Sequence, residues 1–329
     1  MVLTINNDEL ESIVDSCKRE WGINASIKEA DFSRSLPKAE CPSNGIISFP
    51  KRISFNLLLF HLVQKGWNSR NELFFGNHLI NLNEMIVVAL RINDIESAEE
   101  LKKQYFEILK EYSELVLSYD NLECNLRNAM LFFLYHELTH VRKAQQPLFY
   151  EEKKKELAQR VNNAQPAIKR SMKRNLTKLK YLEEEVICDI EACKKLHETK
   201  NNQSEFKETL LDIVHLINLT NSISNLRDKY TGTAKPSICS YFELTHSEST
   251  KTSISRFTFI QNYWKKDLML NGKDLMRDIV STAISLSLNQ KTIDFCRAEF
   301  KKDNEGFIKY DEKAGQKAKI IKEETRWRN

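Results

Sequence analysis

Two histidines stand four residues apart in the stretch LFFLYHELTHVRK, residues 131–143, and a glutamate directly follows the first. On a helix, positions i and i+4 lie one turn apart on the same face, so His136 and His140 can direct their imidazoles at a common point. Zinc takes neutral nitrogen ligands at about 2.0–2.1 Å, and a catalytic zinc site keeps one position open for water. Glu137 would reach that water as a general base without binding the metal. The spacing therefore predicts the working end of a zinc site.

The alternative is a buried helix whose histidines carry no metal, because the HExxH pattern alone over-predicts zinc sites. The preceding run AMLFFLY, residues 129–135, is apolar on all sides, which predicts a helix that is buried just before its histidines. Two uncharged imidazoles and a carboxylate in such a place need partners, and a metal ion is one. The flank therefore favours zinc, with one ion per chain.

A third ligand is expected in the acidic stretch YLEEEVICDIEAC, residues 181–193. Glu185 and Asp189 are again four residues apart, so Glu185 can bind the metal while Asp189 accepts the other ring N–H of a ligand histidine. The alternative is a solvated acidic face, but the apolar residues between the two acids indicate a half-buried helix. Glu184 is the rival ligand, although it has no acid four residues further on.

If His136, His140 and Glu185 hold one zinc, their donor atoms should lie about 3–4 Å apart.

A closed, structural zinc site would be a different arrangement of the same helices. A closed site would need a fourth protein ligand, and Cys188 and Cys193 are the nearest candidates. Cys188 points about 60° away from Glu185 by helical geometry, and a cysteine on an apolar helix face is often plain core.

The segment THSESTKTSISRF, residues 245–257, supplies the remaining candidates. Water attack on a peptide carbonyl builds negative charge on oxygen, which a histidine or tyrosine on the far wall of the cleft would stabilise. His246 is the predicted catalytic donor, at roughly 5–8 Å from the metal. Arg256 is predicted to support the site or the oxyanion. The alternative for His246 is an ordinary surface position, in which case Tyr230 or Tyr241 is the next donor to test.

HELTH, then EVICD with Glu185 forty-five residues after His140, and then TH and an arginine resemble the gluzincin metallopeptidases. In that group the third zinc ligand is a glutamate in ExxxD. The order of motifs is also similar to that of the prenyl-protein peptidases, whose later motif is histidine–proline followed by arginine. This chain has Ser247 in place of that proline and a longer gap to Arg256. It also has none of the membrane spans that those relatives carry.

The chain more closely resembles a soluble, medium-sized bacterial set, the phage-exclusion peptidase (Lit-type) family. The resemblance covers about residues 75–257, and some fifteen positions in it are specific. It implies a latent zinc metalloprotease of antiviral defence, which cleaves a host translation factor after a phage signal appears. The expected partners are therefore a protein or peptide substrate and an activating partner or trigger.

Helical periodicity dominates the chain, which predicts a mainly α fold of the α+β class. With the resemblance, the expected fold is a zincin-like metallopeptidase with a small mixed sheet packed on the HExxH helix. Strands are expected near residues 46–53 and 73–83, with one edge strand running antiparallel to bound substrate. Helices are expected over 8–21, 55–66, 85–90, 97–120, 121–145, 167–198, 203–229, 253–265, 273–289 and 292–303.

Three regions are predicted along the chain. Residues 1–95 form an N-terminal α+β region that includes the substrate-edge strand. Residues 96–303 form the helical zinc metallopeptidase region, and residues 304–329 form a charged tail. No internal repeat or low-complexity linker separates them.

Composition bounds the function class and the compartment. The net charge of +4 is small for 329 residues, with 46 acidic residues interleaved among 50 basic ones, and this gives no case for nucleic acid. Seven cysteines, an odd and scattered number, predict reduced thiols in a cytoplasmic protein. The N-terminus lacks the pattern of a signal peptide, and the longest apolar runs are too short for a membrane span.

The main hypothesis is thus an intracellular zinc endopeptidase that uses metal-activated water. The alternative class is a helical regulatory or interaction protein with a structural or vestigial zinc site. Elemental analysis for one equivalent of zinc is the first measurement that separates a metal site from a metal-free helix pair.

Overall fold

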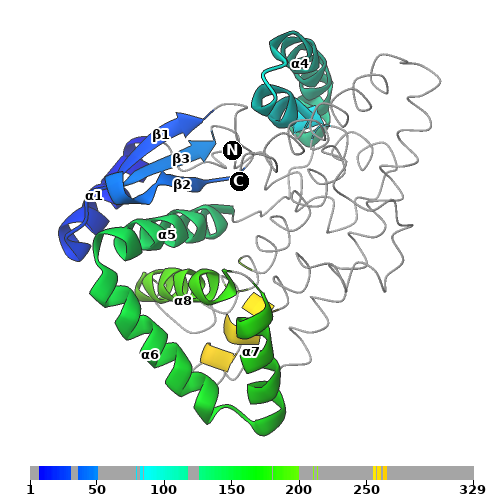
Figure 1. The fold of residues 1–329 in the computed structure, drawn as a ribbon. Helices are drawn as coiled ribbons and strands as arrows, with labels where there is room; N and C mark the ends of the chain where they lie inside the picture. Colours follow the sequence, from blue (N-terminus) through cyan, green and yellow to red (C-terminus); the bar gives the residue numbers. More distant parts are fainter. Residues whose placement is uncertain are drawn as a thin grey trace, which may run out of the picture.

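A computed structural model describes residues 7–30, 36–50, 79, 82–83, 85–117, 126–179, 181–199, 210, 213, 255–256, 258–260 and 262–264. Over these residues the fold is mainly helical with one small mixed sheet (Figure 1). The predicted mainly α class with a small mixed sheet is therefore confirmed. Among the described residues, no helix combines the length and the apolar character needed to cross a bilayer. The three predicted regions stay a prediction.

The sheet is built from β1 (Ser26–Ala30), β2 (Lys38–Cys41) and β3 (Ile46–Pro50), in the order β1-β3-β2. β1 pairs with β3 in parallel and β2 pairs with β3 antiparallel. The strand predicted at IISFP is β3, but it lies in the middle of the described strands, and β1 and β2 are the two edges. β1 and β2 fall in a stretch for which no strand was predicted. They are four or five residues long with mainly exposed side chains, and so short a segment shows little period.

Helix α5 (Leu126–Gln145) lies between the sheet and helix α8 (Leu182–Glu198), as Figure 1 shows. Residues 130–135 are buried, and they share one core with apolar side chains of β3, α8 and helix α1 (Asn7–Trp21). A helix enclosed on two sides needs apolar residues around most of its circumference, which explains why the run before the histidines shows no polar face. The prediction of a sheet packed on this helix is confirmed.

Two further helices brace α8 from outside. Helix α6 (Pro147–Asn163) follows α5 after Gln146, and helix α7 (Pro166–Lys178) follows α6. Each begins with a proline at its first turn, a position where the missing N–H costs nothing. Their apolar side chains form a second core cluster with α8 and Phe259. The site helix α8 is therefore held on both sides.

One long helix was predicted over residues 167–198, and the structure divides it into α7 and α8. The division falls at Tyr181, which has a φ of 64°, in the left-handed region that a non-glycine residue rarely adopts. No glycine or proline marks the break, so the pattern of the sequence could not reveal it. The consequence is that α8 starts just before its acidic residues.

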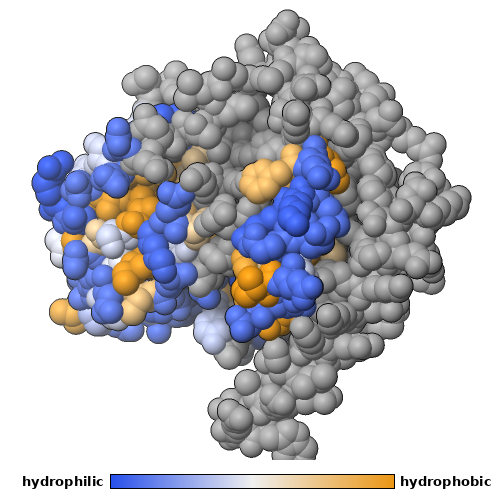
Figure 2. All heavy atoms as spheres, turned by 90° about the horizontal axis from the view of Figure 1, so that it is seen from above, coloured by the Kyte–Doolittle hydropathy of each residue, from blue (hydrophilic) through white to orange (hydrophobic). Residues whose placement is uncertain are grey.

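Helix α4 (Ile95–Leu117) corresponds to the helix predicted from residue 97, but it begins two residues earlier. Asp94 precedes this helix as its N-terminal cap, and its carboxylate accepts a hydrogen bond from the Ser97 N–H at 3.4 Å. Seen from above, the described surface is hydrophilic with small interspersed groups of apolar residues (Figure 2). Two of the exposed apolar side chains, Ile95 and Phe106, belong to α4.

The other predicted elements differ in how far they can be checked. Residues 85–90 are helical as predicted, whereas Leu79, Leu82 and Asn83 are also helical and contradict the strand expected near 73–83. An apolar-polar mixture of this length fits either period, and here the helix prevails. The described residues at 210, 213 and 255–264 are helical, in agreement with the predictions there. The segments 55–66, 273–289, 292–303 and the tail 304–329 lie outside the described residues.

Gln145, the last residue of α5, fastens the sheet to this helix. Its amide Oε1 accepts a hydrogen bond from the Asn24 N–H at 2.8 Å, and its Nε2 donates to the Asn24 carbonyl at 2.8 Å. Gly45, in the turn before β3, has a φ of 74°, and a Cβ there would lie 1.9 Å from the same carbonyl oxygen. The turn and the amide thus fix the start of β1 against the end of α5.

Gln145→Ala is expected to lower the free energy of unfolding by about 1–2 kcal/mol, because two hydrogen bonds of ordinary strength are lost. Gln145→Glu should lose only the Nε2 donor, so its free energy of unfolding should fall between those of the wild type and Gln145→Ala. Urea unfolding measures the change. A matched control is Gln104→Ala, on α4 and away from the sheet. Equal stability of Gln145→Ala and the wild type would contradict this anchoring role.

Candidate metal centre

Helices α5 and α8 carry the side chains that the sequence singled out. His136 and Glu137 are buried in α5, and His140, one turn on, is partly buried. Glu185 and Asp189 stand on α8, where Glu185 is partly exposed and Asp189 is fully buried. Each pair at positions i and i+4 occupies one helix face, so packing α5 against α8 brings two facing pairs together.

The donor atoms of the predicted ligands converge. The Nε2 atoms of His136 and His140 lie 3.2 Å apart. Glu185 places Oε2 at 3.4 Å from the His136 Nε2 and Oε1 at 3.6 Å from the His140 Nε2. Two nitrogen or oxygen donors of a tetrahedral zinc, each about 2.0–2.1 Å from it, would be about 3.3–3.4 Å apart. The structure thus brings the three residues together within the expected 3–4 Å.

Asp189 and Arg256 lie beside the first histidine. The Asp189 Oδ1 is 2.9 Å from the His136 Nδ1, a close contact that lacks the alignment of a hydrogen bond. Arg256 donates to both oxygens of Asp189, at 2.7 and 2.6 Å, and a third nitrogen lies 3.2 Å from Glu185. Both predicted supporting residues are therefore in the cluster, and the guanidinium links the two carboxylates.

Glu184 has a different place from the one expected of a rival ligand. Its Oε1 lies 2.9 Å from the Nδ1 of His140, on the ring side opposite the cluster, and its other oxygen pairs with Lys143. The hydrogen bond to His140 is the main cause, and Lys143 the lesser one, that lowers the pKa of Glu184 to about 2. Each histidine thus has a carboxylate at Nδ1, which fixes the ring orientation and leaves Nε2 for a metal. The run of three glutamates, residues 183–185, was the signal in the sequence for a carboxylate partner of His140.

Glu137 faces the sheet edge. Its Oε2 accepts a hydrogen bond of 2.7 Å from the backbone N–H of Ala39, in β2. Burial raises the pKa of the Glu137 carboxyl, against the opposing effect of the two histidines. A carboxyl group with a raised pKa exchanges protons closer to neutral pH, as a general base must. Nothing in the sequence pointed to Ala39, since 98 residues separate it from Glu137.

Charge in the cluster is unbalanced. Four carboxylates face two side-chain cations: Glu137, Glu184, Glu185 and Asp189 against Lys143 and Arg256. With neutral imidazoles, the excess is two negative charges, which a divalent cation would neutralise. In the metal-free chain a proton on His136 offsets one of these two charges: burial lowers the pKa of His136, but Asp189 and Glu185 outweigh it and raise that pKa to about 10.

Arg256 keeps the acids of the cluster ionised. Burial alone would raise the pKa of Glu185 and of Asp189, but the guanidinium and His136 hold both pKa values below their usual range. Deprotonated carboxylate is the form that binds metal or accepts a ring N–H. The arginine thereby prepares both acids for the roles that the spacing predicted.

Cys188 also lies in the cluster. Its Sγ and one donor nitrogen from each of His136 and His140 all lie within 4.8 Å of one another, and these three residues form a group that could hold a metal ion. Cys188 is 1% exposed. Cys193, the other cysteine considered, packs in the core that α5 shares with α1 and the sheet. The structure thus separates the two cysteines, which the sequence analysis named together as the nearest candidates for a fourth ligand.

His246, the predicted oxyanion donor, lies outside the described residues, as do Tyr230 and Tyr241. The predicted 5–8 Å between His246 and the metal therefore stays a prediction. His197, a histidine away from the cluster, packs against Trp264 with 5.2 Å between ring centroids and a tilt of 37° between the rings.

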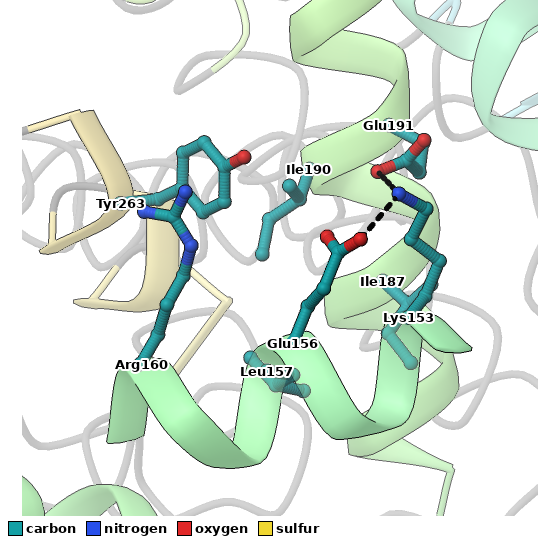
Figure 3. A pocket seen from close by; sticks show the side chains of 8 residues that line it. All are labelled: Lys153, Glu156, Leu157, Arg160, Ile187, Ile190, Glu191 and Tyr263. Atoms are coloured by element: carbon teal, nitrogen blue, oxygen red, sulfur yellow. Dashed lines mark hydrogen bonds and ion pairs between the residues drawn. The ribbon is translucent and has the colours of Figure 1, made fainter. Parts of the chain in front are cut away.

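A small hollow lies between α6 and α8, away from the metal centre (Figure 3). Lys153 bridges Glu156 and Glu191 at 2.9 and 3.7 Å, and the Arg160 guanidinium stands 3.6 Å from the Tyr263 ring centroid. By helical geometry, the α8 residues of this hollow face away from Glu185 and Asp189. Lys153 is paired with the two glutamates and Arg160 lies on the Tyr263 ring, so the hollow braces α8 and is not part of the metal centre.

Comparison of the chain with protein-family models gives no match, and comparisons with curated proteins and with solved structures give none either. The zincin-like fold and the family resemblance accordingly rest on the motifs of the sequence.

Proposed function

We propose that this chain is a zinc-dependent endopeptidase with His136, His140 and Glu185 as the ligands. The observation that carries the proposal is the set of three donor separations. The two histidine Nε2 atoms on α5 lie 3.2 Å apart, and the Glu185 oxygens on α8 lie 3.4 and 3.6 Å from them. The excess of two negative charges around the histidines supports a divalent ion at this point. Nitrogen and carboxylate donors are the ones that zinc takes in catalytic sites.

Zinc, when bound, acts as a Lewis acid and lowers the pKa of a coordinated water. Glu137 is the proton carrier: its Oε2 is held by the Ala39 N–H, and we assign Oε1 to proton transfer. Glu184 is hydrogen-bonded to the Nδ1 of His140, and Asp189 lies against the Nδ1 of His136. Arg256 keeps Glu185 and Asp189 in place. Each of these residues thus has a role that its contacts support.

Substrate is proposed to run along β2. This strand is an edge among the described strands, and the Ala39 N–H points away from β3 toward Glu137. An extended peptide can add to such an edge through main-chain hydrogen bonds. A peptide bond lying there would be beside the proposed general base, which suits an endopeptidase acting on an extended protein segment.

The biological setting follows from the resemblance alone. A Lit-type peptidase would be latent in the cytoplasm and act in phage defence when a phage signal appears. His246 would stabilise the oxyanion, and a trigger or activating partner would control access to the site.

Zinc content and substrate cleavage test the proposal. Elemental analysis of the full chain should give one zinc per chain, and none in His136→Ala. Labelling of new protein N-termini should give cleavage products in cells expressing the wild type, under phage challenge, that are missing with Glu137→Gln. The proposal would be overturned if the wild-type chain, purified without chelator, bound no zinc even after zinc was added.

Zinc affinity is expected to rise with pH, by up to about tenfold per unit between pH 6 and 8, because binding must displace the proton on His136. The sign follows from the raised pKa, since the metal-free histidine is protonated over this whole range. Competition with a chromophoric chelator at several pH values measures the affinity, and proton release into weak buffer measures the displacement. An affinity independent of pH would show that His136 is already neutral.

The alternative, a structural zinc site in a regulatory protein, has one observation in its favour. Cys188 lies near both histidines and offers a fourth protein donor. A closed site of this kind would bind zinc but cleave nothing, in any state of the protein.

A further inference from the structure

A buried thiol stands among the donors of the metal centre. The Cys188 Sγ lies within 4.8 Å of a donor nitrogen of His136 and of His140. A sulfur about 2.3 Å and a nitrogen about 2.0–2.1 Å from one tetrahedral zinc would be about 3.6 Å apart. The largest shift needed is thus on the order of an ångström, which rotation of the thiol can supply. Cys188 is therefore within reach of a metal at this centre.

The spacing on α8 supports the same reading. Cys188 follows Glu185 by three residues, and residues at i and i+3 are neighbours on a helix surface. Helical metal sites use Glu-x-x-His at this spacing to direct two donors at one ion. The 60° between Glu185 and Cys188, which at first counted against the thiol, is the angle that lets one helix offer two donors to the histidines facing it.

The surroundings of Cys188 are charged. Glu185, Asp189, Glu137 and Glu184 all raise the pKa of its thiol, after burial itself. Cys193, five residues on, is equally buried but packs with apolar neighbours in the core. Imidazole, carboxylate and thiolate together form a donor set that zinc accepts.

We propose that Cys188 is the fourth protein donor of the resting metal centre, so that the ion has no open position until this thiolate leaves. This inference rests on the proposed function and adds a source of latency. On binding, the Cys188 S–H bond breaks, its proton goes to solvent, and a sulfur–metal bond forms. No oxidant or reductant is involved. The resting chain then holds metal in a closed site, and activation means withdrawal of one side chain.

Cobalt(II) reports on this donor directly, because a thiolate ligand adds a charge-transfer band in the near ultraviolet. Full-length wild type, Cys188→Ala and Cys193→Ala are loaded with one equivalent of cobalt, and bound metal is measured in each. Cys193→Ala is the matched control, since it deletes an equally buried thiol of the same helix. The band is expected in the wild type and the control, and its loss is expected in Cys188→Ala.

The other outcomes distinguish the two proposals. Cobalt bound by the wild type without the band overturns the role of Cys188 and leaves the metal centre standing. A band that persists in Cys188→Ala also overturns that role. A wild type that binds no cobalt and no zinc overturns both. Cys188→Ser is the second variant, and should Cys188→Ala fail to fold, the serine variant decides by the same band.

Activity gives an independent reading. With the thiolate removed, basal peptidase activity toward an unfolded protein should rise at least about tenfold in Cys188→Ala and stay unchanged in Cys193→Ala, because the open position that a catalytic zinc needs is then present without a trigger. Equal basal activity in the wild type and Cys188→Ala, with the band lost, would show that the thiol binds metal but does not impose latency.

Discussion

Glu137→Gln should lower proteolysis by about 10²–10⁴-fold, the usual cost of losing a general base, and leave the zinc content unchanged. The amide oxygen of glutamine can still accept the Ala39 N–H, so the side chain should keep its position against β2. What it loses is the ability to take up and pass on a proton. Turnover of a cleaved substrate, measured beside elemental analysis of the same sample, tests both halves.

Stability separates this loss from a folding defect. Burial raises the pKa of Glu137, so its charged form is disfavoured in the folded chain, and the neutral amide should fold at least as well. Glu183→Gln is the control, since it makes the same substitution at a partly exposed position at the start of α8, where Glu183 pairs with Lys154. Its activity should equal that of the wild type. Full activity or toxicity of Glu137→Gln would instead favour the interaction-protein alternative.

The parts of the site that the sequence predicted are those in which the residues are close along the chain. His136 with His140, and Glu185 with Asp189, follow from helical spacing alone, because a helix turns residues four apart onto one face. The residue types then predicted a metal site, since imidazole and carboxylate on facing helices are metal donors. The Arg256 prediction rested on a motif comparison, and its carboxylate partner became visible only in the fold.

The parts that escaped prediction depend on contacts between distant segments. The Ala39 N–H is a backbone group, and any residue could supply it, so no side-chain pattern reveals its bond to Glu137. Glu184 was recognised as acidic, but whether it turns toward the metal or toward the Nδ1 of His140 depends on how α8 rotates against α5. The same rotation brings Cys188 near the histidines.

The fold shows the same division. Most long helices and the strand β3 were predicted, while helix α6, the strands β1 and β2 and the helix break at Tyr181 were not. A short strand has too few residues to show alternation, and a left-handed tyrosine carries no signal in its type. The edge strand that is proposed to hold substrate therefore could not be placed before the structure.

Arg256→Gln should lower the free energy of unfolding of the metal-free chain by about 3–5 kcal/mol, the range for removing one partner of a buried ion pair. Asp189 has no exposed surface, and Arg256 gives it two hydrogen bonds and the only guanidinium described at this cluster. Glutamine leaves that carboxylate charged and buried beside Glu185. Arg256→Lys keeps the charge but loses the paired geometry, and should fall between the wild type and glutamine.

The comparison with a surface arginine and with zinc makes the expectation specific to this cluster. Arg127 pairs with Glu9 at an exposed position, so Arg127→Gln should cost about 0–1 kcal/mol. Zinc should restore part of the stability of Arg256→Gln, because a ligand that binds only the folded chain shifts the unfolding equilibrium and here also supplies positive charge. Urea unfolding with chelator and with zinc measures both. If Arg256→Gln in chelator lost no more than Arg127→Gln, the guanidinium would not be what holds Glu185 and Asp189 ready for the metal.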